Sequence, residues 1–413
     1  MSFNEWKEVK LEDVVDTISK RHKFDKDKII LINTSDVLEG KVLNHEYVQN
    51  ENLKGQFKKS FQKNDILYSE IRPQNKRFAY VDFQSDDYVA STKLMVLRKK
   101  NEMITSNFLY QILKSDDLIN ELQVIAESRS GTFPQITYNE LSRMKIKLPP
   151  LDEQKAIAHI LSTLDDKIEV NNQINKTLEN MAQVIFKQWF VDFEFPNEDG
   201  EPYKSSGGEM VESELGMIPK GWEVVELNKL AKLTMGLSPK SESYNTDYIG
   251  TPLLNGAADF NNGLIKANKF TTQPTRICEK GDLVFCIRAT IGNITFADQE
   301  FCLGRGVAAL KPLSGSYIGL IYFNLDMAME RLKANATGSV ILGLSKPDIN
   351  NLKIILPSED ILNRFSEISN NILNFKHNFE REIGELIDIR DSLLPKLMSG
   401  EIRVPLDSEG DAS

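Results

Sequence analysis

The sequence is poor in cysteine and has no long apolar run. Its 413 residues include three Cys and four His, and none of these has the CxxC or HExxH spacing of zinc sites. We expect Cys278, Cys286 and Cys302 to be buried thiols, and we expect no metal site. No segment reaches the roughly 18 apolar residues of a membrane span, and the amino terminus lacks the apolar core of a signal peptide. A cytoplasmic protein without membrane association is therefore predicted.

Signatures of catalysis are missing as well. The sequence has no GxxxxGK[ST] phosphate loop, no GxSxG nucleophile motif and no Asn/Asp-Pro-Pro-aromatic motif of the amino-methyltransferases. The triplet Glu153-Gln154-Lys155 is similar to half of a nuclease site. It lies in the first turn of an expected helix, however, where carboxylates interact favourably with the helix dipole. We predict that the chain has no catalytic residues and is not an enzyme by itself.

An internal repeat with an offset of 208 to 217 residues is present instead. Trp6, Val9 and Leu11 recur as Trp222, Val225 and Leu227, DILYSEIR (65–72) recurs as DLVFCIR (282–288), and LSRMKIKLP (141–149) recurs as INNLKIILP (349–357). A period this long excludes solenoids and propellers, whose units have roughly 20 to 50 residues. It indicates a duplicated domain with pseudo-two-fold symmetry.

Each copy has an α+β pattern followed by a long helical segment. Residues 65–71, 77–83, 282–287 and 293–298 have the β-branched and aromatic content of strands, and residues 106–126 and 317–334 have helical spacing. We predict recognition domains at 1–150 and 221–357, long helices at 151–195 and 358–400, a linker at 196–220 and a tail at 401–413. Asp152 and Ser358, each close after a proline, are expected N-caps.

The two long helical segments carry heptad-like apolar seams. One seam runs from Ile361 to Leu393, and the other, from Ile157 to Trp189, contains Asn171 and Asn175 midway. These asparagines lie either in the seam, where they would fix the register, or just beside it in solvent. Each body enters its helix at the amino-terminal end, and a parallel pair would force the linker to return over the whole helix length. An antiparallel coiled coil is therefore predicted.

The net charge of −10 is unevenly distributed. Residues 1–150 and 221–357 each carry +2, whereas 151–220 carry −8 and 358–413 carry −6. Local basic faces, rather than the total charge, decide whether a protein binds phosphate. The two bodies can therefore hold basic faces although the chain is acidic.

Basic and polar residues occur in loop-like segments of both copies. Arginine can pair with guanine in the major groove, while Lys, Ser and Thr hold phosphates. We predict that double-stranded DNA is contacted by Arg21, His22, Lys23, Ser69, Arg72, Arg77, Lys93, Arg129, Ser130 and Thr132 in the first copy, and by Ser238, Lys240, Arg288, Thr290, Arg305, Thr337 and Ser339 in the second.

Three motifs resemble the specificity subunit of type I restriction-modification systems: KLPPLDEQKAIAHIL (147–161), FKQWFVDFEFP (186–196) and LLPKLMSGEIRV (393–404). The resemblance spans the chain, although the identity of Phe133-Pro134-Gln135 with its counterpart is weak. It implies a subunit that binds a bipartite, asymmetric DNA sequence and recruits two adenine methyltransferase subunits, which restriction motor-endonuclease subunits join for cleavage. The resemblance also implies that S-adenosylmethionine, ATP and magnesium belong to those partners and that this chain holds no cofactor.

The apolar helical faces exceed what one helix pair would bury. We therefore expect Trp189, Phe190, Leu393 and Leu394 to dock the methyltransferase subunits. Two other classes of function stay open. A stand-alone nuclease with an unrecognised acidic-x-Lys site would cut DNA with magnesium alone, and a coiled-coil scaffold would bind no DNA even with partners present.

Overall fold

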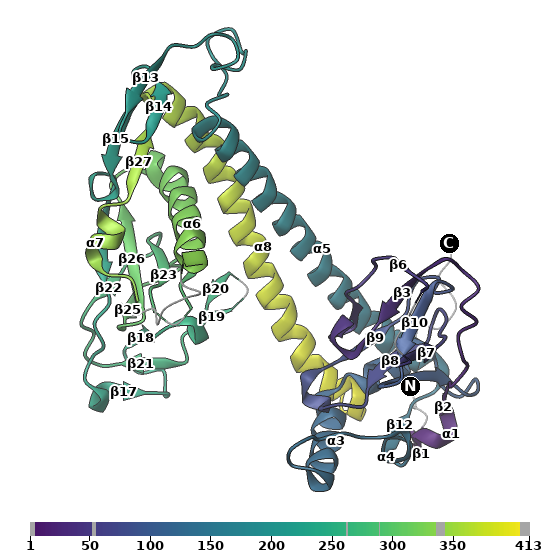
Figure 1. Ribbon diagram of the computed structural model, residues 1–413. Coiled ribbons are helices and arrows are strands. Elements are labelled where there is room, and N and C mark those ends of the chain that lie inside the picture. The colour runs from purple at the N-terminus through teal and green to yellow at the C-terminus, as the bar shows by residue number, and fades with distance from the viewer. Residues whose placement is uncertain (1–4, 52–54, 262, 289, 336–342, 405–413) are drawn as a thin grey trace, which may run out of the picture. The chain divides into compact units, whose positions relative to one another are not determined.

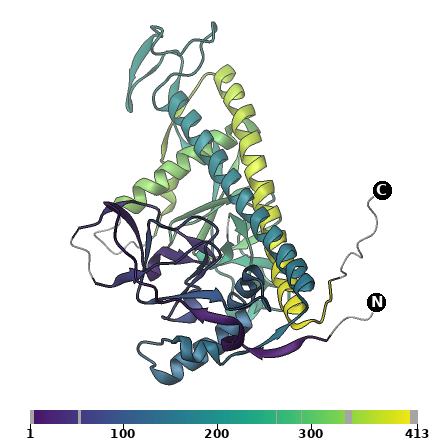
Figure 2. The same ribbon diagram turned by 90° about the vertical axis from the view of Figure 1, so that its right-hand side faces the viewer.

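The computed structural model describes residues 5–51, 55–261, 263–288, 290–335 and 343–404. The chain forms two compact units, unit 1 with Met1–Lys167 and Ile387–Ser413, and unit 2 with Ile168–Leu386. Each unit holds one copy of the repeat and one part of both long helices, so the units differ from the predicted domains. Because the division between the units crosses both long helices, it does not test the predicted domain boundaries, which stay predictions. The α+β class is confirmed (Figures 1 and 2).

Unit 1 contains two four-stranded sheets. The first has the strand order β2-β11-β8-β9 with antiparallel neighbours, and the second has the order β6-β3-β10-β7, in which β3 and β10 run parallel. The strands are β2 (Val15–Thr17), β11 (Leu94–Lys99), β8 (Ile66–Ser69), β9 (Phe78–Tyr80), β6 (Val48–Gln49), β3 (Lys28–Ile32), β10 (Tyr88–Ser91) and β7 (Phe57–Lys59). A short hairpin joins β4 (Val37–Leu38) and β5 (Lys41–Val42), and β1 (Lys7–Lys10) pairs with β12 (Lys145–Leu148).

Alternation along the central strands separates two apolar cores. Ile66 and Tyr68 of β8 face the core on the helical side, whereas Leu67 belongs to the core shared by the two sheets. A strand points successive side chains to opposite faces, so a continuous apolar run such as this one is buried on both sides. Unit 1 is therefore built of three layers: helices, first sheet and second sheet.

The helices of unit 1 lie on one side of the first sheet. They are α1 (Leu11–Val14), α2 (Ser106–Leu113), α3 (Asp116–Arg129) and α4 (Tyr138–Ser142). The single helix predicted over 106–126 is wrong, because Ser115 has an extended backbone and its hydroxyl donates to the Ile112 carbonyl at 2.8 Å. This side-chain bond competes with a continuous helix and starts a second one.

Unit 2 has the same order of strands as unit 1, with one additional edge strand, β17, in its second sheet. Its first sheet is β16-β26-β23-β24, with antiparallel neighbours, and its second sheet is β17-β21-β18-β25-β22, with β18 and β25 parallel. The strands are β16 (Ala231–Met235), β26 (Val307–Pro312), β23 (Leu283–Cys286), β24 (Gly292–Phe296), β17 (Tyr244–Asn245), β21 (Lys269–Thr271), β18 (Thr251–Leu254), β25 (Phe301–Leu303) and β22 (Ile277–Cys278). Further pairs join β15 (Glu223–Glu226) to β27 (Lys353–Leu356) and β19 (Phe260–Asn261) to β20 (Leu264–Ile265), and the unit's short helices are α6 (Ile318–Asn335) and α7 (Lys346–Asn350).

The sequence repeat corresponds to this shared topology. The repeated segments at 65–72 and 282–288 contain the central strands β8 and β23, and the repeated ends of each copy form the pairs β1·β12 and β15·β27. All three cysteines are free and buried in unit 2, as expected. The predicted linker holds a hairpin of β13 (Met210–Ser213) and β14 (Gly216–Pro219), which glycine and serine content alone did not indicate.

The long helices are α5 (Leu151–Phe190) and α8 (Glu359–Ser399), and parts of both run antiparallel in each unit (Figure 1). In unit 1, Arg390 donates to Asp165 at 3.1 Å, and in unit 2, Asn171 donates to Glu382 at 2.9 Å. Asn171 and Asn175 are buried, which decides between the two alternatives in favour of the seam. Because α5 begins at Leu151, Asp152 lies inside the first turn and is not the N-cap.

Candidate nucleic-acid interface

The topology of unit 1 brings the ends of three chain segments to one edge of the first sheet. Strand β11 begins opposite the end of β8, since Leu94 pairs with Ser69. The segment after β2 starts at the same edge, where the Ile18 amide donates to the Val96 carbonyl at 2.7 Å. The connection Thr92-Lys93 between β10 and β11 leads into this edge. Loops that are distant in the sequence therefore share a surface at the end of the first sheet where β8 ends and β11 begins. We call this surface the loop edge.

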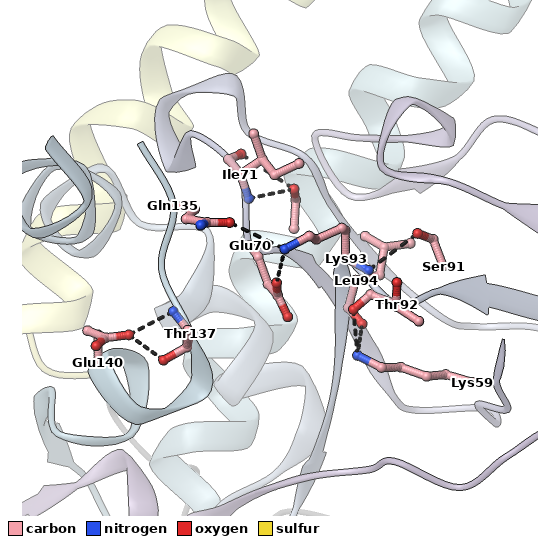
Figure 3. A network of polar contacts seen from close by, with 11 residues as sticks. Lys59, Glu70, Ile71, Ser91, Thr92, Lys93, Leu94, Gln135, Thr137 and Glu140 are labelled. Atoms are coloured by element: carbon pink, nitrogen blue, oxygen red, sulfur yellow. Dashed lines mark hydrogen bonds and ion pairs between the residues drawn. The ribbon is translucent and has the colours of Figure 1, made fainter. Parts of the chain in front are cut away.

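Lys93 is the centre of a polar network at the loop edge of unit 1. Its ammonium group donates to the Glu70 carboxylate and to the Gln135 side-chain carbonyl, both at 3.3 Å (Figure 3). The backbone of Gln135 pairs with Ile71, and the Ile136 amide donates to the Glu70 carbonyl at 2.8 Å. The segment before α4 is thereby bound to the segment after β8.

Arg72 lies in the same network. Its amide donates to the Pro134 carbonyl at 3.0 Å, and its guanidinium donates to the Thr132 carbonyl at 3.4 Å. The φ angle of Arg72 is 45°, a left-handed conformation that is uncommon for a residue with a side chain. Strained residues of this kind cluster at functional sites, where the surrounding structure holds them.

Arg129 and Ser130 belong to the segment that follows α3. Arg129 forms an ion pair with Glu140 at 2.7 Å, and the Ser130 hydroxyl accepts from the Phe133 amide at 3.1 Å. Burial alone would raise the pKa of Glu140. Hydrogen bonds from Thr137 and the charge of Arg129 outweigh it and hold the pKa below its ordinary value, so this carboxylate stays ionised. Arg129 is thereby fixed beside the network.

Lys59 is a member of the loop edge that sequence reasoning missed. Its ammonium group donates to the carbonyls of Thr92 and Leu94, at 3.0 and 2.7 Å, and Arg21 forms a β-bridge with it. Burial lowers the pKa of Lys59; the charge of Glu70 acts against this shift and that of Lys93 acts with it. Lys59 therefore holds the connection that presents Lys93.

Some predicted residues of unit 1 are not surface groups. His22 is buried, and its ring accepts from the Phe24 amide at 3.0 Å, while Arg21 and Lys23 on either side are exposed. Ser69 is also buried and accepts from the Ile71 amide at 3.0 Å. Arg77 donates to the carbonyls of Ser35 and Val37. We therefore assign His22 and Ser69 to holding the loops rather than contacting DNA.

Unit 2 presents an equivalent loop edge. Arg305 is exposed in the connection between β25 and β26, which is the counterpart of the connection that holds Lys93, and its amide donates to the Ser238 hydroxyl at 3.2 Å. Arg288 follows β23 as Arg72 follows β8, and Lys240 follows β16 as Lys23 follows β2. Arg288, Thr290 and Lys240 are exposed. Thr337 and Ser339 lie outside the described residues.

Of the four residues predicted to dock partners, two are buried in a core and two are packed against one. Trp189 and Phe190 are buried in unit 2, where Phe190 packs edge-on against Phe365 with ring centres 4.6 Å apart. Leu393 and Leu394 are partly buried against the helical core of unit 1. The expectation rested on an excess of apolar surface, but these side chains fill the chain's own core. We therefore correct the assignment of Trp189 and Phe190 to a partner surface.

Glu153 is part of a structural clamp. Its side chain is 2% exposed and accepts two bonds from the Arg403 guanidinium, at 2.5 and 2.7 Å, and one from the Trp6 indole at 3.2 Å. The clamp ties the start of α5 to the segment after α8 within unit 1. Among the described residues, no group of His, Cys, Asp or Glu could hold a metal ion, and no helix is long and apolar enough to span a membrane.

Comparison with known proteins gives the family. The type I restriction modification DNA specificity domain matches residues 4–180 and 219–385, one match for each copy of the repeat. The chain belongs to the family of type I restriction enzyme specificity subunits. The HindI specificity subunit of Haemophilus influenzae is 32% identical over 97% of this chain and 100% of its own length. The putative MjaX specificity subunit of Methanocaldococcus jannaschii is 28% identical over 82% of this chain and 79% of its own length.

A solved structure has the same fold as this specificity subunit. The crystal structure of the S subunit of a type I restriction-modification system from M. genitalium matches with a TM-score of 0.64 over 96% of both chains, at 17% identity. At this identity the likeness shows the fold alone. Two unlike copies on a shared fold are what the internal repeat predicted.

Proposed function

We propose that this specificity subunit binds a bipartite DNA sequence and that the loop edge of each unit reads one half of it. The observation that carries the proposal is the equivalence of the two loop edges. The same connections present Arg72 and Lys93 in unit 1 and Arg288 and Arg305 in unit 2. Two similar sites with unlike side chains suit a target with two unlike halves.

The chemistry of the loop edges suits duplex DNA. Lysine and arginine neutralise phosphates, which supplies affinity without sequence information. Arginine can also make two bonds to guanine in the major groove. Fixed loops are required for such contacts, and the hydrogen bonds between the segments after β8 and before α4 supply this rigidity in unit 1.

Catalysis is proposed to belong to partner subunits. In this proposal two adenine methyltransferase subunits bring S-adenosylmethionine, and restriction motor-endonuclease subunits bring ATP and magnesium chemistry. Glu153, the one acidic residue of the nuclease-like triplet, is bound to Arg403 and Trp6 and would leave buried charge unpaired if it moved to substrate. The alternative of a stand-alone nuclease therefore loses its candidate carboxylate.

An exposed apolar stripe on α5 is the proposed docking surface for a methyltransferase subunit. Val170, Met181 and Val184 are 49%, 51% and 64% exposed, and their spacing places them on one face of the helix. Phe375 of α8 is 58% exposed in the same unit. Exposed apolar residues in a row mark interaction sites more often than isolated ones do.

The proposed function is tested by reconstitution with the methyltransferase subunits. We expect the complex to methylate adenine in one bipartite sequence, and we expect Met181→Lys with Val184→Lys to prevent co-purification of a methyltransferase subunit. The matched control is Asn172→Lys with Gln183→Lys, two exposed positions of the same helix that lie away from the stripe. A complex that forms but never methylates or binds a defined sequence would contradict the proposal.

A further inference from the structure

The two loop edges differ at one equivalent position. Thr137 and Ser345 cap the equivalent helices α4 and α7, and counting back two residues from each pairs Gln135 with Gly343. The adjacent hydrogen bonds agree, because Ile136 donates to the Glu70 carbonyl at 2.8 Å and Leu344 donates to the Ile287 carbonyl at 2.9 Å. The position therefore holds an amide side chain in unit 1 and no side chain in unit 2.

Arg288 takes the space that a side chain at Gly343 would need. A Cβ atom placed on Gly343 would lie 2.8 Å from Cγ of Arg288, and the glycine has a φ angle of 101° that side-chain residues rarely adopt. The arginine side chain is thus laid against the glycine at the loop edge. In unit 1 the residue equivalent to Gly343 is Gln135, whose side-chain carbonyl Lys93 binds (Figure 3).

From this exchange we infer that Gln135 and Arg288 are base-reading residues of the two half-sites, Gln135 for an A·T pair and Arg288 for a G·C pair. A glutamine amide can donate to adenine N7 and accept from adenine N6, whereas a guanidinium donates twice to guanine. The bond from Lys93 uses only one of the two lone pairs on the Gln135 carbonyl oxygen. It also fixes which end of the amide is the donor.

The inference deepens the proposed function and rests on it. Lys93 is a positioning residue here, and Glu70 holds its ammonium group at 3.3 Å. The oriented amide of Gln135 loses less conformational freedom on binding than a free amide does. The arrangement therefore favours discrimination of an A·T pair from other base pairs. The equivalent role in unit 2 falls to the contact of Arg288 with the Gly343 backbone.

The test uses the complex of the full chain with its methyltransferase subunits and a panel of duplexes in which each base pair of the target is changed in turn. Gln135→Met keeps the side-chain length and removes the amide, and Arg288→Met removes the guanidinium. We expect Gln135→Met to lower the preference for one A·T pair in one half-site by roughly 10- to 100-fold, and Arg288→Met to do so at one G·C pair in the other half.

The controls are Gln62→Met, an exposed glutamine beyond the opposite end of β8, and Arg331→Met, an exposed arginine of α6. Both should leave every preference unchanged. The inference would be overturned if the wild-type complex methylates a bipartite target but Gln135→Met leaves every base-pair preference unchanged. It would also be overturned if Gln135→Met lowers methylation equally on all duplexes. If the wild-type complex prefers no bipartite sequence, the proposed function itself fails.

Discussion

Arg305 shows at the scale of one residue how the fold can supply a phosphate contact. It is exposed between two glycines, Gly304 and Gly306, in the connection into β26. A Cβ atom on either glycine would lie within 3 Å of backbone or side-chain atoms of the 254–255 segment. The tight packing of this connection against the 254–255 segment fixes the backbone position from which the Arg305 side chain extends.

Replacing Arg305 with Met should weaken DNA binding by the methyltransferase complex about 10-fold. It should also reduce the slope of log affinity against log salt concentration by about 1, the contribution of one phosphate contact. The reason is the loss of one cation from a fixed loop. The measurement is the affinity for the target duplex at several salt concentrations. Lys311→Met, which removes an exposed cation near the opposite end of the same strand, should have little effect. Equal losses in the two variants would contradict the placement of DNA at the loop edge.

Residue types in loop-like segments were enough to predict that Arg72, Lys93, Arg288 and Arg305 are exposed in connections between strands, because arginine and lysine are rarely buried without partners. Their contact with DNA stays a prediction. Residue types were not enough for His22 and Ser69, whose burial depends on strands far away in the sequence. Lys59 and Gln135 were missed for the same reason. Lys59 lies in a strand and becomes relevant only because its ammonium group reaches the Thr92 and Leu94 carbonyls across the sheet.

At the scale of elements, α5 is held at its amino-terminal end by the clamp of Glu153, Arg403 and Trp6. Arg403 also lies over the Trp6 ring, with its guanidinium carbon 5.6 Å from the ring centre. The hydrogen bonds that Arg403 donates to the Glu153 carboxylate raise the pKa of Arg403 above its ordinary value. Residues 400–404, which follow α8, are therefore part of the structure of unit 1.

Changing Arg403 to Met should lower the free energy of unfolding by about 2 kcal/mol, because it leaves the Glu153 carboxylate buried without its cation. The partial exposure of Arg403, 21% of its side chain, keeps the expected loss below that of a fully buried pair. Urea denaturation measures the change. Arg381→Met, which removes an exposed i,i+4 pair with Glu385, should cost under about 0.5 kcal/mol. A loss no larger than that of the control would refute the clamp.

The seam of α5 in unit 2 contains a second polar feature. Asn175 is 8% exposed and its side-chain oxygen is among the buried atoms without a hydrogen-bond partner. A buried polar group in a helix seam reduces stability and can fix the register. One turn earlier, Asn171 is bound to Glu382.

Asn175→Leu should therefore raise the free energy of unfolding by about 1 kcal/mol, since it replaces an unsatisfied acceptor with an apolar side chain. Thermal and urea unfolding of the full chain can measure this. Asn172→Leu, at an exposed position of the same helix, is the control and should change stability by less than about 0.5 kcal/mol. Destabilisation of the chain by Asn175→Leu would contradict the claim that the Asn175 side-chain oxygen is an unsatisfied buried acceptor.

The elements themselves were largely predictable. Heptad spacing and buried strand runs depend on local periodicity, which explains the agreement for α5, α8, β8 and β23. The break at Ser115 and the hairpin at 210–219 depend on a single side-chain bond and on the pairing of two short strands, for which periodicity gives no signal. The pairings that form the loop edges are long-range contacts and needed the structure.

For the whole molecule, duplication explains why the specificity domain of the family matches the chain twice, at residues 4–180 and 219–385. Two copies share strand order and the position of their loop edges, while side chains such as Gln135 and Gly343 differ. Each copy closes on itself, because its first and last strands pair, β1 with β12 and β15 with β27. A copy can therefore diverge in its loops without changing the other.

The most direct test of this account is methylation mapping after exchange of residues 221–357 for the same region of another specificity subunit with a different known target. If each copy reads one half of the DNA sequence, the hybrid should methylate a target in which one half is new and the other half is unchanged. A hybrid that folds and methylates, but changes both halves or neither, would contradict the claim that the two copies are independent readers.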